Sequence, residues 1–398
     1  MLHRNSRRVN DVVRFTGSST FPRQLALQPG TVQEFVTPGM TYSPIFGPDS
    51  LKIWFNCSPS LGVFDPSTQE IRTISTPAGS MEEILVGPDG NVWFGSVGVF
   101  SSGHFSGNGL GYSTPDGQVQ FFGTAGWVVH LAYGSDRVWF TQEQGATGGG
   151  WVLTSDYSVH TFDTNLATVG PISTIGGAWF GEFGPHLAFV ADDGQLLEYT
   201  TRAGAITLPL AFDPNGNLWY GTDVEIGYVN PGGQLVQIDI GGNGAFAVLF
   251  DGDGTVWFAS SFGSQIGHMN PDGSNLVMYP ISGLPSGLVF GSDGNPWFTE
   301  FTNRVGTIVN GEVREFPTSG AQAYPPILGA DGNVWFSDSG DGSILTQTKI
   351  GYVTPSGTVS ESDTVGIPNG LLSDGTWIYF GENALRFGRV LVITNNLT

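Results

Sequence analysis

Two histidines and three glutamates are the side chains of this sequence that suit acid–base chemistry. His130 stands in a Val-His-Leu run and His186 in a Pro-His-Leu run, while Glu143, Glu182 and Glu300 each follow closely after a Trp-Phe doublet. Proton abstraction needs a base over an acidic C–H, and an acid or a cation that stabilises the developing charge, on one rim of a site. The simpler alternative for both histidines is a turn or strand-end residue with a satisfied hydrogen bond. These residues act together only if the fold brings them together.

The element that positions them is a repeat built around an aromatic doublet. Nine copies occur, spaced 38 to 46 residues apart: Trp54-Phe55, Trp93-Phe94, Trp139-Phe140, Trp179-Phe180, Trp219-Tyr220, Trp257-Phe258, Trp297-Phe298, Trp335-Phe336 and, in a degenerate form, Tyr379-Phe380. A period near 40 residues is typical of β-propeller blades with four strands each. The sequence therefore predicts an all-β propeller of seven to nine blades, with nine favoured.

The doublet itself indicates how the strands pack. Adjacent strand residues point to opposite faces, so an aromatic pair predicts that both faces are buried. Face-to-face stacking of blades meets that requirement. Dipeptides such as Asp331-Gly332 precede most doublets and supply the positive φ that tight hairpins need.

The two chain ends are predicted to share a blade. The chain starts on the outer half of a unit and ends after an inner pair, so the segment Thr31 to Phe35 is expected in the same sheet as Trp377 to Phe380. Such closure removes open sheet edges. In the irregular middle of the chain, the stretch Pro185 to Gly194 could be an inner strand in its own right, which leaves the unit boundaries there open.

Composition excludes several classes of protein. The formal charge is −21, from 14 Lys and Arg against 35 Asp and Glu, which argues against a nucleic-acid partner. No run reaches the 18 or more apolar residues of a membrane span, and no apolar segment of a secretory signal peptide is present. The single cysteine, Cys57, makes disulfides and cysteine metal sites unexpected. A virion or the cytoplasm is the expected location. The 60 glycines are expected at hairpin turns.

The N-terminus carries the opposite charge. Five of the 14 cationic residues stand in the first 23 positions: Arg4, Arg7, Arg8, Arg14 and Arg23. Residues 1–20 are predicted to form a basic arm, and residues 21–398 a single propeller domain. The arm is either a solvated tail or a segment that docks on an acidic neighbour in an assembly of protein subunits.

The repeat resembles the virginiamycin B lyase (streptogramin lyase) family over most of the chain. The likeness rests on Gly-Ser-Asp-Gly-Asn-Pro-Trp-Phe-Thr-Glu at 291–300, Ile-Gly-His-Met-Asn-Pro-Asp-Gly at 266–273 and Glu-Val-Arg-Glu-Phe-Pro at 312–317. It implies a propeller that opens a cyclic depsipeptide by elimination, with Mg²⁺ and a His/Glu set at one end of the central channel. His130, His186, Glu143, Glu182 and Glu300 are the residues that could supply that set.

The sequence departs from the family where the chemistry would lie. The resemblance implies a catalytic histidine in a Pro-His-Gly-Ile-type strand before the Asp-Gly turn, but the strand at 285–288 is Pro-Ser-Gly-Leu and the one at 368–371 is Pro-Asn-Gly-Leu. Two functions follow. The first is a non-enzymatic binding or structural module of a larger assembly, such as a bacteriophage tail, that needs no cofactor. The alternative is a Mg²⁺-dependent carbon–oxygen lyase acting on a cyclic peptide or another small ligand.

Overall fold

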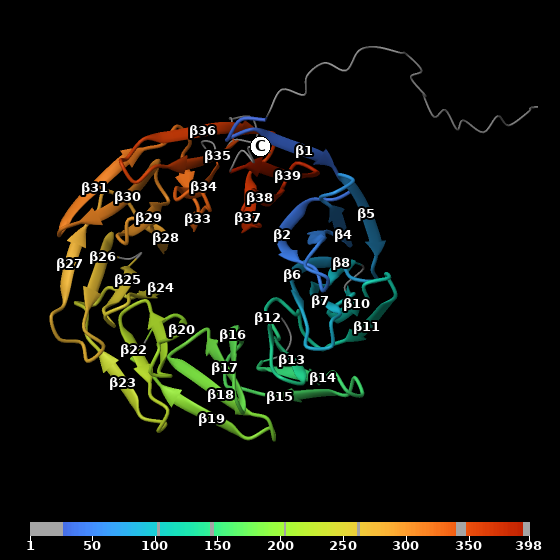
Figure 1. Cartoon of the computed structure of the whole chain (residues 1–398). Helices are drawn as coiled ribbons and strands as arrows, with labels where there is room; N and C mark the ends of the chain where they lie inside the picture. The colour runs from blue at the N-terminus through green and yellow to red at the C-terminus, as the bar shows by residue number, and fades with distance from the viewer. Residues whose placement is uncertain are drawn as a thin grey trace, which may run out of the picture.

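The computed structural model describes residues 27–101, 104–143, 147–202, 204–260, 263–339 and 348–392, and within these ranges the regular structure consists of β-strands. The strands form antiparallel units of four positions that follow one another around a ring (Figure 1). Across these ranges, no helix of the length and apolar character of a membrane span is present. The all-β propeller prediction is confirmed.

The described strands group into nine such units, numbered here along the chain. Units 1 to 4 are β2 (Thr41–Phe46), β3 (Ile53–Cys57), β4 (Ser60–Asp65), β5 (Glu70–Ser75); β6 (Ser80–Val86), β7 (Val92–Val97), β10 (Gly109–Ser113), β11 (Val119–Gly123); β12 (Leu131–Tyr133), β13 (Arg137–Thr141), β14 (Gly149–Leu153), β15 (Val159–Phe162); and β16 (Thr168–Thr174), β17 (Gly177–Glu182), β18 (His186–Ala191), β19 (Leu196–Thr200). A short hairpin, β8 (Val99–Ser101) with β9 (His104–Ser106), is inserted in unit 2.

Units 5 to 9 complete the ring. They are β20 (Thr207–Phe212), β21 (Leu218–Thr222), β22 (Ile226–Val229), β23 (Leu235–Ile238); β24 (Ala247–Phe250), β25 (Val256–Ser260), β26 (Gln265–Met269), β27 (Val277–Pro280); β28 (Pro285–Phe290), β29 (Pro296–Glu300), β30 (Arg304–Val309), β31 (Glu312–Pro317); β32 (Gln322–Ala323) with β33 (Ile327–Leu328), β34 (Val334–Ser339), β35 (Thr348–Val353), β36 (Val359–Thr364); and β37 (Pro368–Ser373), β38 (Trp377–Glu382), β39 (Arg386–Leu391), β1 (Val32–Val36). Units 4 and 5 are joined by one bridge between Glu182 and Thr207.

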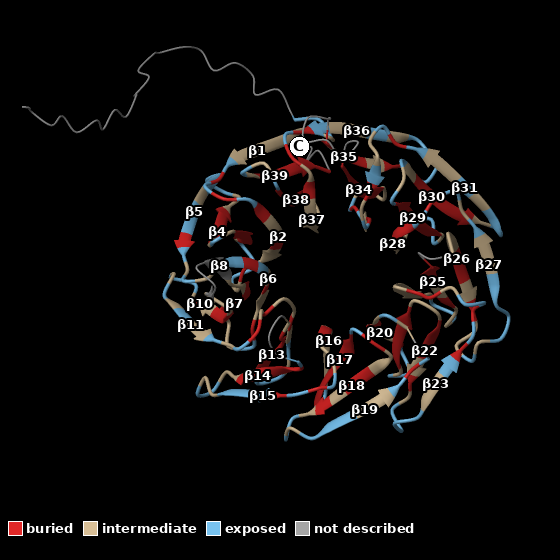
Figure 2. Cartoon of the chain, turned by 180° about the vertical axis from the view of Figure 1, so that it is seen from behind, coloured by how far each residue is buried: buried red, intermediate tan, exposed pale blue. Residues whose placement is uncertain are grey.

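Each aromatic doublet lies on the second strand of a unit, and its two rings face different neighbours. Trp54 packs with Ile84 and Phe94 of unit 2. Phe55 packs with Tyr379 and the other apolar residues of unit 9. Burial is therefore highest in the second and third strands and falls towards the outer fourth strands (Figure 2). The prediction that both faces of the doublet strand are buried is confirmed.

The aspartate of the repeat fixes the tryptophan as well as the turn. In unit 2 the Asp89 carboxylate accepts a hydrogen bond from Trp93 Nε1 at 3.1 Å, and in unit 8 Asp331 does the same for Trp335 at 3.1 Å. The following Gly332 has φ of +80°, as the turn requires. A buried indole N–H is thus satisfied without a break in the apolar stack.

Glycines inside third strands are required for close packing, whereas the turn glycines are required for a positive φ. Gly306 and Gly388 lie inside β30 and β39, where an added Cβ would overlap the rings of Phe298 and Phe380 on the adjacent second strands. The Phe of each doublet therefore lies over the backbone of the third strand. The expectation that glycines fall at hairpin turns is incomplete, because this group is needed for close packing of a ring on a strand.

The predicted closure of the ring is confirmed. β1 pairs with β39 from Val32 opposite Val390 to Val36 opposite Arg386, so it belongs to the sheet that contains β38. The rings of Phe55 and Phe387, 4.2 Å apart and stacked, join unit 1 to unit 9. N-terminal and C-terminal segments therefore complete one sheet.

The structure resolves the alternative that the sequence left open in the middle of the chain. The stretch at 185–194 is not an inner strand, because β18 is the third strand of unit 4 and pairs with β17 on one side and β19 on the other. The innermost position of this unit is taken by β16, which pairs with the other edge of β17. His186 therefore starts a third strand.

Candidate functional site

All five predicted acid–base residues lie on one face of the ring. The strands of a unit alternate in direction, so second strands end where first and third strands begin. His130 precedes the first strand β12, His186 begins the third strand β18, and Glu143, Glu182 and Glu300 stand at or after the ends of second strands. We call the face of the ring at which the second strands end the carboxyl face. One residue per unit occupies the equivalent end position: Cys57, Ser96, Gln142, Glu182, Thr222, Ser260, Glu300, Asp338 and Glu382.

His130 and Glu143 belong to a group of ionisable residues from the first strand β6, the start of β12 and the end of the second strand β13. His130 Nδ1 lies 3.7 Å from Glu83 Oε2, which also accepts the Leu131 amide at 2.8 Å. The pKa of neighbouring Glu82 is raised, first by burial and then by the Glu143 carboxylate, while His130 lowers it. We call Glu82, Glu83, His130 and Glu143 the inner group.

His186 does not join the inner group. It stands on a third strand of another unit, opposite Thr200 of β19. Within the part of the chain that the structure describes, its ring takes part in neither an ion pair nor a hydrogen bond. The two predicted histidines therefore occupy different units and different strand positions.

Glu182 is buried against another acid. Its side chain is fully buried and neither carboxylate oxygen has a hydrogen-bond donor among the described residues. Burial raises its pKa to about 7, and the carboxyl group of Glu198 on β19 raises it further. A carboxyl group in this setting is stabilised when it holds a proton that it shares with its neighbour.

Glu300 repeats this arrangement in unit 7. Burial raises its pKa to about 7, and Glu315 on β31 contributes in the same direction. Its Oε2 accepts the Thr302 hydroxyl at 2.9 Å. Ser286 stands where the family pattern implies a histidine. Its hydroxyl is within hydrogen-bond distance of the Thr299 hydroxyl (2.7 Å) and the Ala323 carbonyl (2.6 Å). The acid is present without an imidazole in that position.

Two further pairs of this kind were missed by the sequence analysis. Burial raises the pKa of Asp338, with Glu361 of β36 adding to the effect. Burial raises the pKa of Glu382 to about 8, with Glu34 of β1 as the second cause. In each pair the first acid ends a second strand and its partner lies on the fourth strand. The available signal was an acid directly after the doublet, combined with a glutamate on the outer strand.

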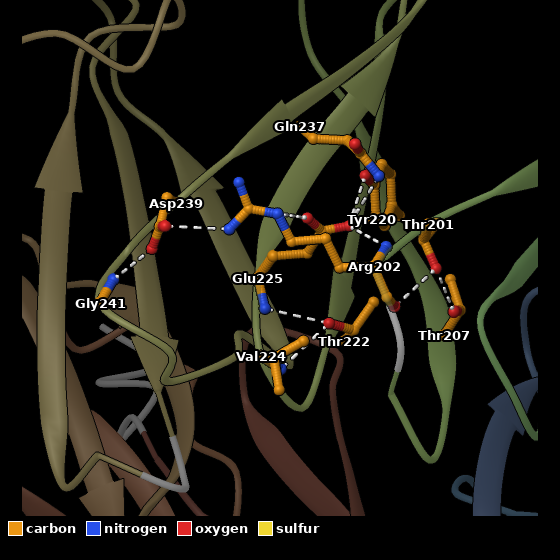
Figure 3. Close-up of polar contacts among 10 residues, drawn as sticks. All are labelled: Thr201, Arg202, Thr207, Tyr220, Thr222, Val224, Glu225, Gln237, Asp239 and Gly241. Carbon is orange, nitrogen blue, oxygen red and sulfur yellow. Dashed lines mark hydrogen bonds and ion pairs between the residues drawn. The ribbon is translucent and has the colours of Figure 1, made fainter.

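Unit 5 buries a carboxylate differently (Figure 3). Glu225 precedes the third strand β22 and is fully buried, and its Oε1 accepts the Tyr220 hydroxyl at 3.0 Å and the Arg202 amide at 3.0 Å. Arg202 Nε lies 3.3 Å from Glu225 Oε2, and the same guanidinium contacts Asp239 at 2.9 Å. Gln237 occupies the fourth-strand position that holds glutamate in the acid pairs. Here a cation, rather than a shared proton, compensates the buried charge.

Two further histidines, His160 and His268, are packed on aromatic rings. His160 stacks on Trp151 with ring centroids 5.1 Å apart, and His268 lies 4.5 Å from the Trp257 centroid. Burial lowers the pKa of His268. Among the described residues no group of three or more His, Cys, Asp or Glu side chains is arranged to hold a metal ion. The Mg²⁺ that the resemblance implies therefore has no fitting ligand set in the described part of the chain.

The predicted assembly arginines cannot be placed on this surface. Arg4, Arg7, Arg8 and Arg14 lie outside the described residues.

Comparisons with known proteins give a consistent family and fold. The sequence profile of the Virginiamycin B lyase family matches residues 127–390. No curated protein sequence matches the chain. Among solved structures, a eukaryotic initiation factor has a TM-score of 0.58 at 12% identity, with 83% of this chain and 89% of that chain covered. The computationally designed Ika8 protein has a TM-score of 0.50 at 12% identity, covering 83% and 98%.

Virginiamycin B lyase structures are also similar. A catalytically inactive variant of the lyase from Staphylococcus aureus, crystallised with quinupristin, has 17% identity and a TM-score of 0.49, with 91% of this chain and 99% of that chain covered. At this identity the likeness concerns the fold alone.

Proposed function

Because this chain belongs to the virginiamycin B lyase family, we propose that it keeps the propeller of that family and acts as a non-catalytic binding module within a larger protein assembly. The observation that carries the proposal is the environment of the predicted catalytic acids. Glu182 and Glu300 are each buried against a second carboxyl group from the fourth strand of their own unit. Elimination needs such an acid to face a base and the substrate.

The position of Ser286 supports the same conclusion. A serine hydroxyl held by Thr299 and the Ala323 carbonyl is not a base for an acidic C–H. In unit 7 the acid of the expected His/Glu set is therefore kept, while the base is replaced by a residue that packs the first strand on its neighbours.

The basic arm supplies the means of attachment in this proposal. Residues 1–26 contain five arginines and one aspartate, whereas the remaining chain contains nine Lys or Arg and 34 Asp or Glu. Arg4, Arg7, Arg8 and Arg14 are proposed to contact acidic protein subunits, with a virion such as a bacteriophage tail as the expected setting. Such contacts weaken as salt screens them.

The proposal is tested by the mass of the native particle that contains the chain. We expect a particle far heavier than the 42.3 kDa chain, and its dissociation when Arg4, Arg7, Arg8 and Arg14 are replaced by alanine. Arg72→Ala, on the outer strand β5, is the matched control that should keep the particle intact. A native mass equal to that of the chain alone would contradict the proposal.

The inner group supports a second candidate function, a lyase acting on a small ligand in the channel. His130 and Glu83 form an ion pair when the imidazole is protonated, and Glu82 and Glu143 lie close enough to affect each other's charge. A base and several acids thus meet on the carboxyl face. Since these residues do not form a fitting metal site, this candidate ranks below the binding module.

A further inference from the structure

The acid pair of unit 9, Glu34 and Glu382, differs from the other acid pairs because its two residues come from opposite ends of the chain. Glu34 lies on β1, near the N-terminus, and Glu382 ends β38, near the C-terminus. Glu34 stands opposite Gly388 of β39, which in turn stands opposite Phe380, two residues before Glu382. The Phe380 ring lies over this glycine, and the amides of Val365 and Gly366, which are adjacent in the chain, donate to Glu34 and Glu382 respectively, which brings the two acids close together. In this unit alone among the nine, the pair bridges the two ends of the chain.

The surroundings of the pair provide hydrogen-bond donors but little positive charge. The Val365 amide donates to Glu34 at 2.8 Å, and the adjacent Gly366 amide donates to Glu382 Oε2 at 2.9 Å. Glu382 is fully buried and its Oε1 has no donor in the described part of the chain. The charged groups facing the pair are the two acids themselves and Arg386 of β39, whose Nε is 3.9 Å from Glu34 Oε2. The Thr41 hydroxyl of β2 accepts a hydrogen bond from the Glu382 backbone amide at 2.7 Å and donates one to the Arg386 carbonyl.

We propose that Glu34 and Glu382 share one proton, and that this proton fastens β1 to the ring, so that its loss to solvent base at alkaline pH loosens the N-terminal strand. Two adjacent carboxylates without a shared proton repel each other, and one partly exposed arginine cannot compensate both. The repulsion between Glu34 and Glu382 would weaken the pairing of β1 with β39.

The sign of the pH dependence follows from the direction of the pKa change. Burial raises the pKa of Glu382 from 4.5 to about 8. A group whose pKa is higher in the folded state stabilises that state below its unfolded value, and the contribution is lost as pH rises through the folded value. Closure should therefore be tight at pH 5 and weakened above about pH 8.

The test is hydrogen exchange of the β1 amides, residues 32–36, between pH 6 and pH 10, corrected for the base-catalysed intrinsic rate. We expect the protection factor of the wild-type strand to fall by up to about tenfold per pH unit from pH 6 to about pH 8, where the closed form keeps the proton and the open form has lost it, and to level off above about pH 8. Glu382→Gln should hold its protection constant over this range, because a neutral amide cannot lose the proton. Glu34→Gln should behave in the same way and serves as the second variant if the first does not fold.

The matched control is Glu300→Gln, which changes the equivalent acid in unit 7, and it should leave the pH dependence of β1 as in the wild type. Persistence of the wild-type pH dependence in both Glu382→Gln and Glu34→Gln would overturn the proposal. Recovery of β1 protection at pH 9 on addition of Mg²⁺ would also overturn it, because the pair would then hold a cation rather than a proton.

Discussion

Unit 5 and unit 4 are neighbours in one sheet, yet they bury a carboxyl group by opposite means. In unit 5 Glu225 is matched by Arg202 and by donors from Tyr220 and Gln237. In unit 4 Glu182 faces Glu198, and its raised pKa follows from burial and from that second acid. The units differ at two positions: the fourth strand carries Gln237 in unit 5 and Glu198 in unit 4, and the second strand ends in Thr222 in unit 5 and Glu182 in unit 4.

This difference shows why a buried acid is weak evidence for catalysis. A raised pKa and a position at the rim of a channel are features of catalytic acids, but structural pairs produce them as well. The pattern recurs at Glu300, Asp338 and Glu382, in the consecutive units 7, 8 and 9. Recurrence of the same acid pair in four units favours a structural origin.

The largest loss of stability should come from removing Glu225, the buried acid that Arg202 compensates in unit 5. Glu225→Ala leaves the Tyr220 hydroxyl and the Arg202 amide without their acceptor in a buried site, so we expect the free energy of unfolding to fall by about 3 kcal/mol. Chemical denaturation at pH 7 measures this. Since the Arg202 side chain is half exposed, its charge can turn to water, and a loss much greater than this would contradict the account.

A smaller and pH-dependent effect is expected in unit 4. The pKa of Glu182 is raised to about 7, so the stability that it provides is present at low pH and is lost as pH rises from about 4.5 through 7. Between pH 5 and 8, the free energy of unfolding of the wild type should therefore fall by about 2 to 3 kcal/mol more than that of Glu182→Gln. Denaturation curves at several pH values measure the difference. An unchanged slope would show that Glu182 and Glu198 share no proton.

Sequence reasoning located the strands well because the Trp-Phe doublet has a local cause. Trp54 and Phe55 must each meet a neighbouring unit, and this requirement is visible in the residues themselves. Closure by β1 could also be predicted, since an incomplete unit stands at each end of the chain. The role of Gly306 was not visible, because it depends on how a ring on the adjacent strand is placed.

The candidate site was predicted only in part. The sequence singled out His130, His186, Glu143, Glu182 and Glu300, which the structure places on the carboxyl face, but it did not reveal their partners. Glu198 lies 16 residues beyond Glu182 in the chain, and Glu34 is separated from Glu382 by almost the whole sequence. Such contacts depend on strand register, which a single sequence does not reveal.

The central claim, that this propeller binds rather than catalyses, is tested most directly by incubating the purified chain with a streptogramin B such as quinupristin in the presence of added Mg²⁺. The account predicts no opening of the cyclic peptide above the buffer control. Opening that requires Mg²⁺, is abolished by His130→Ala and persists in Arg72→Ala would contradict it.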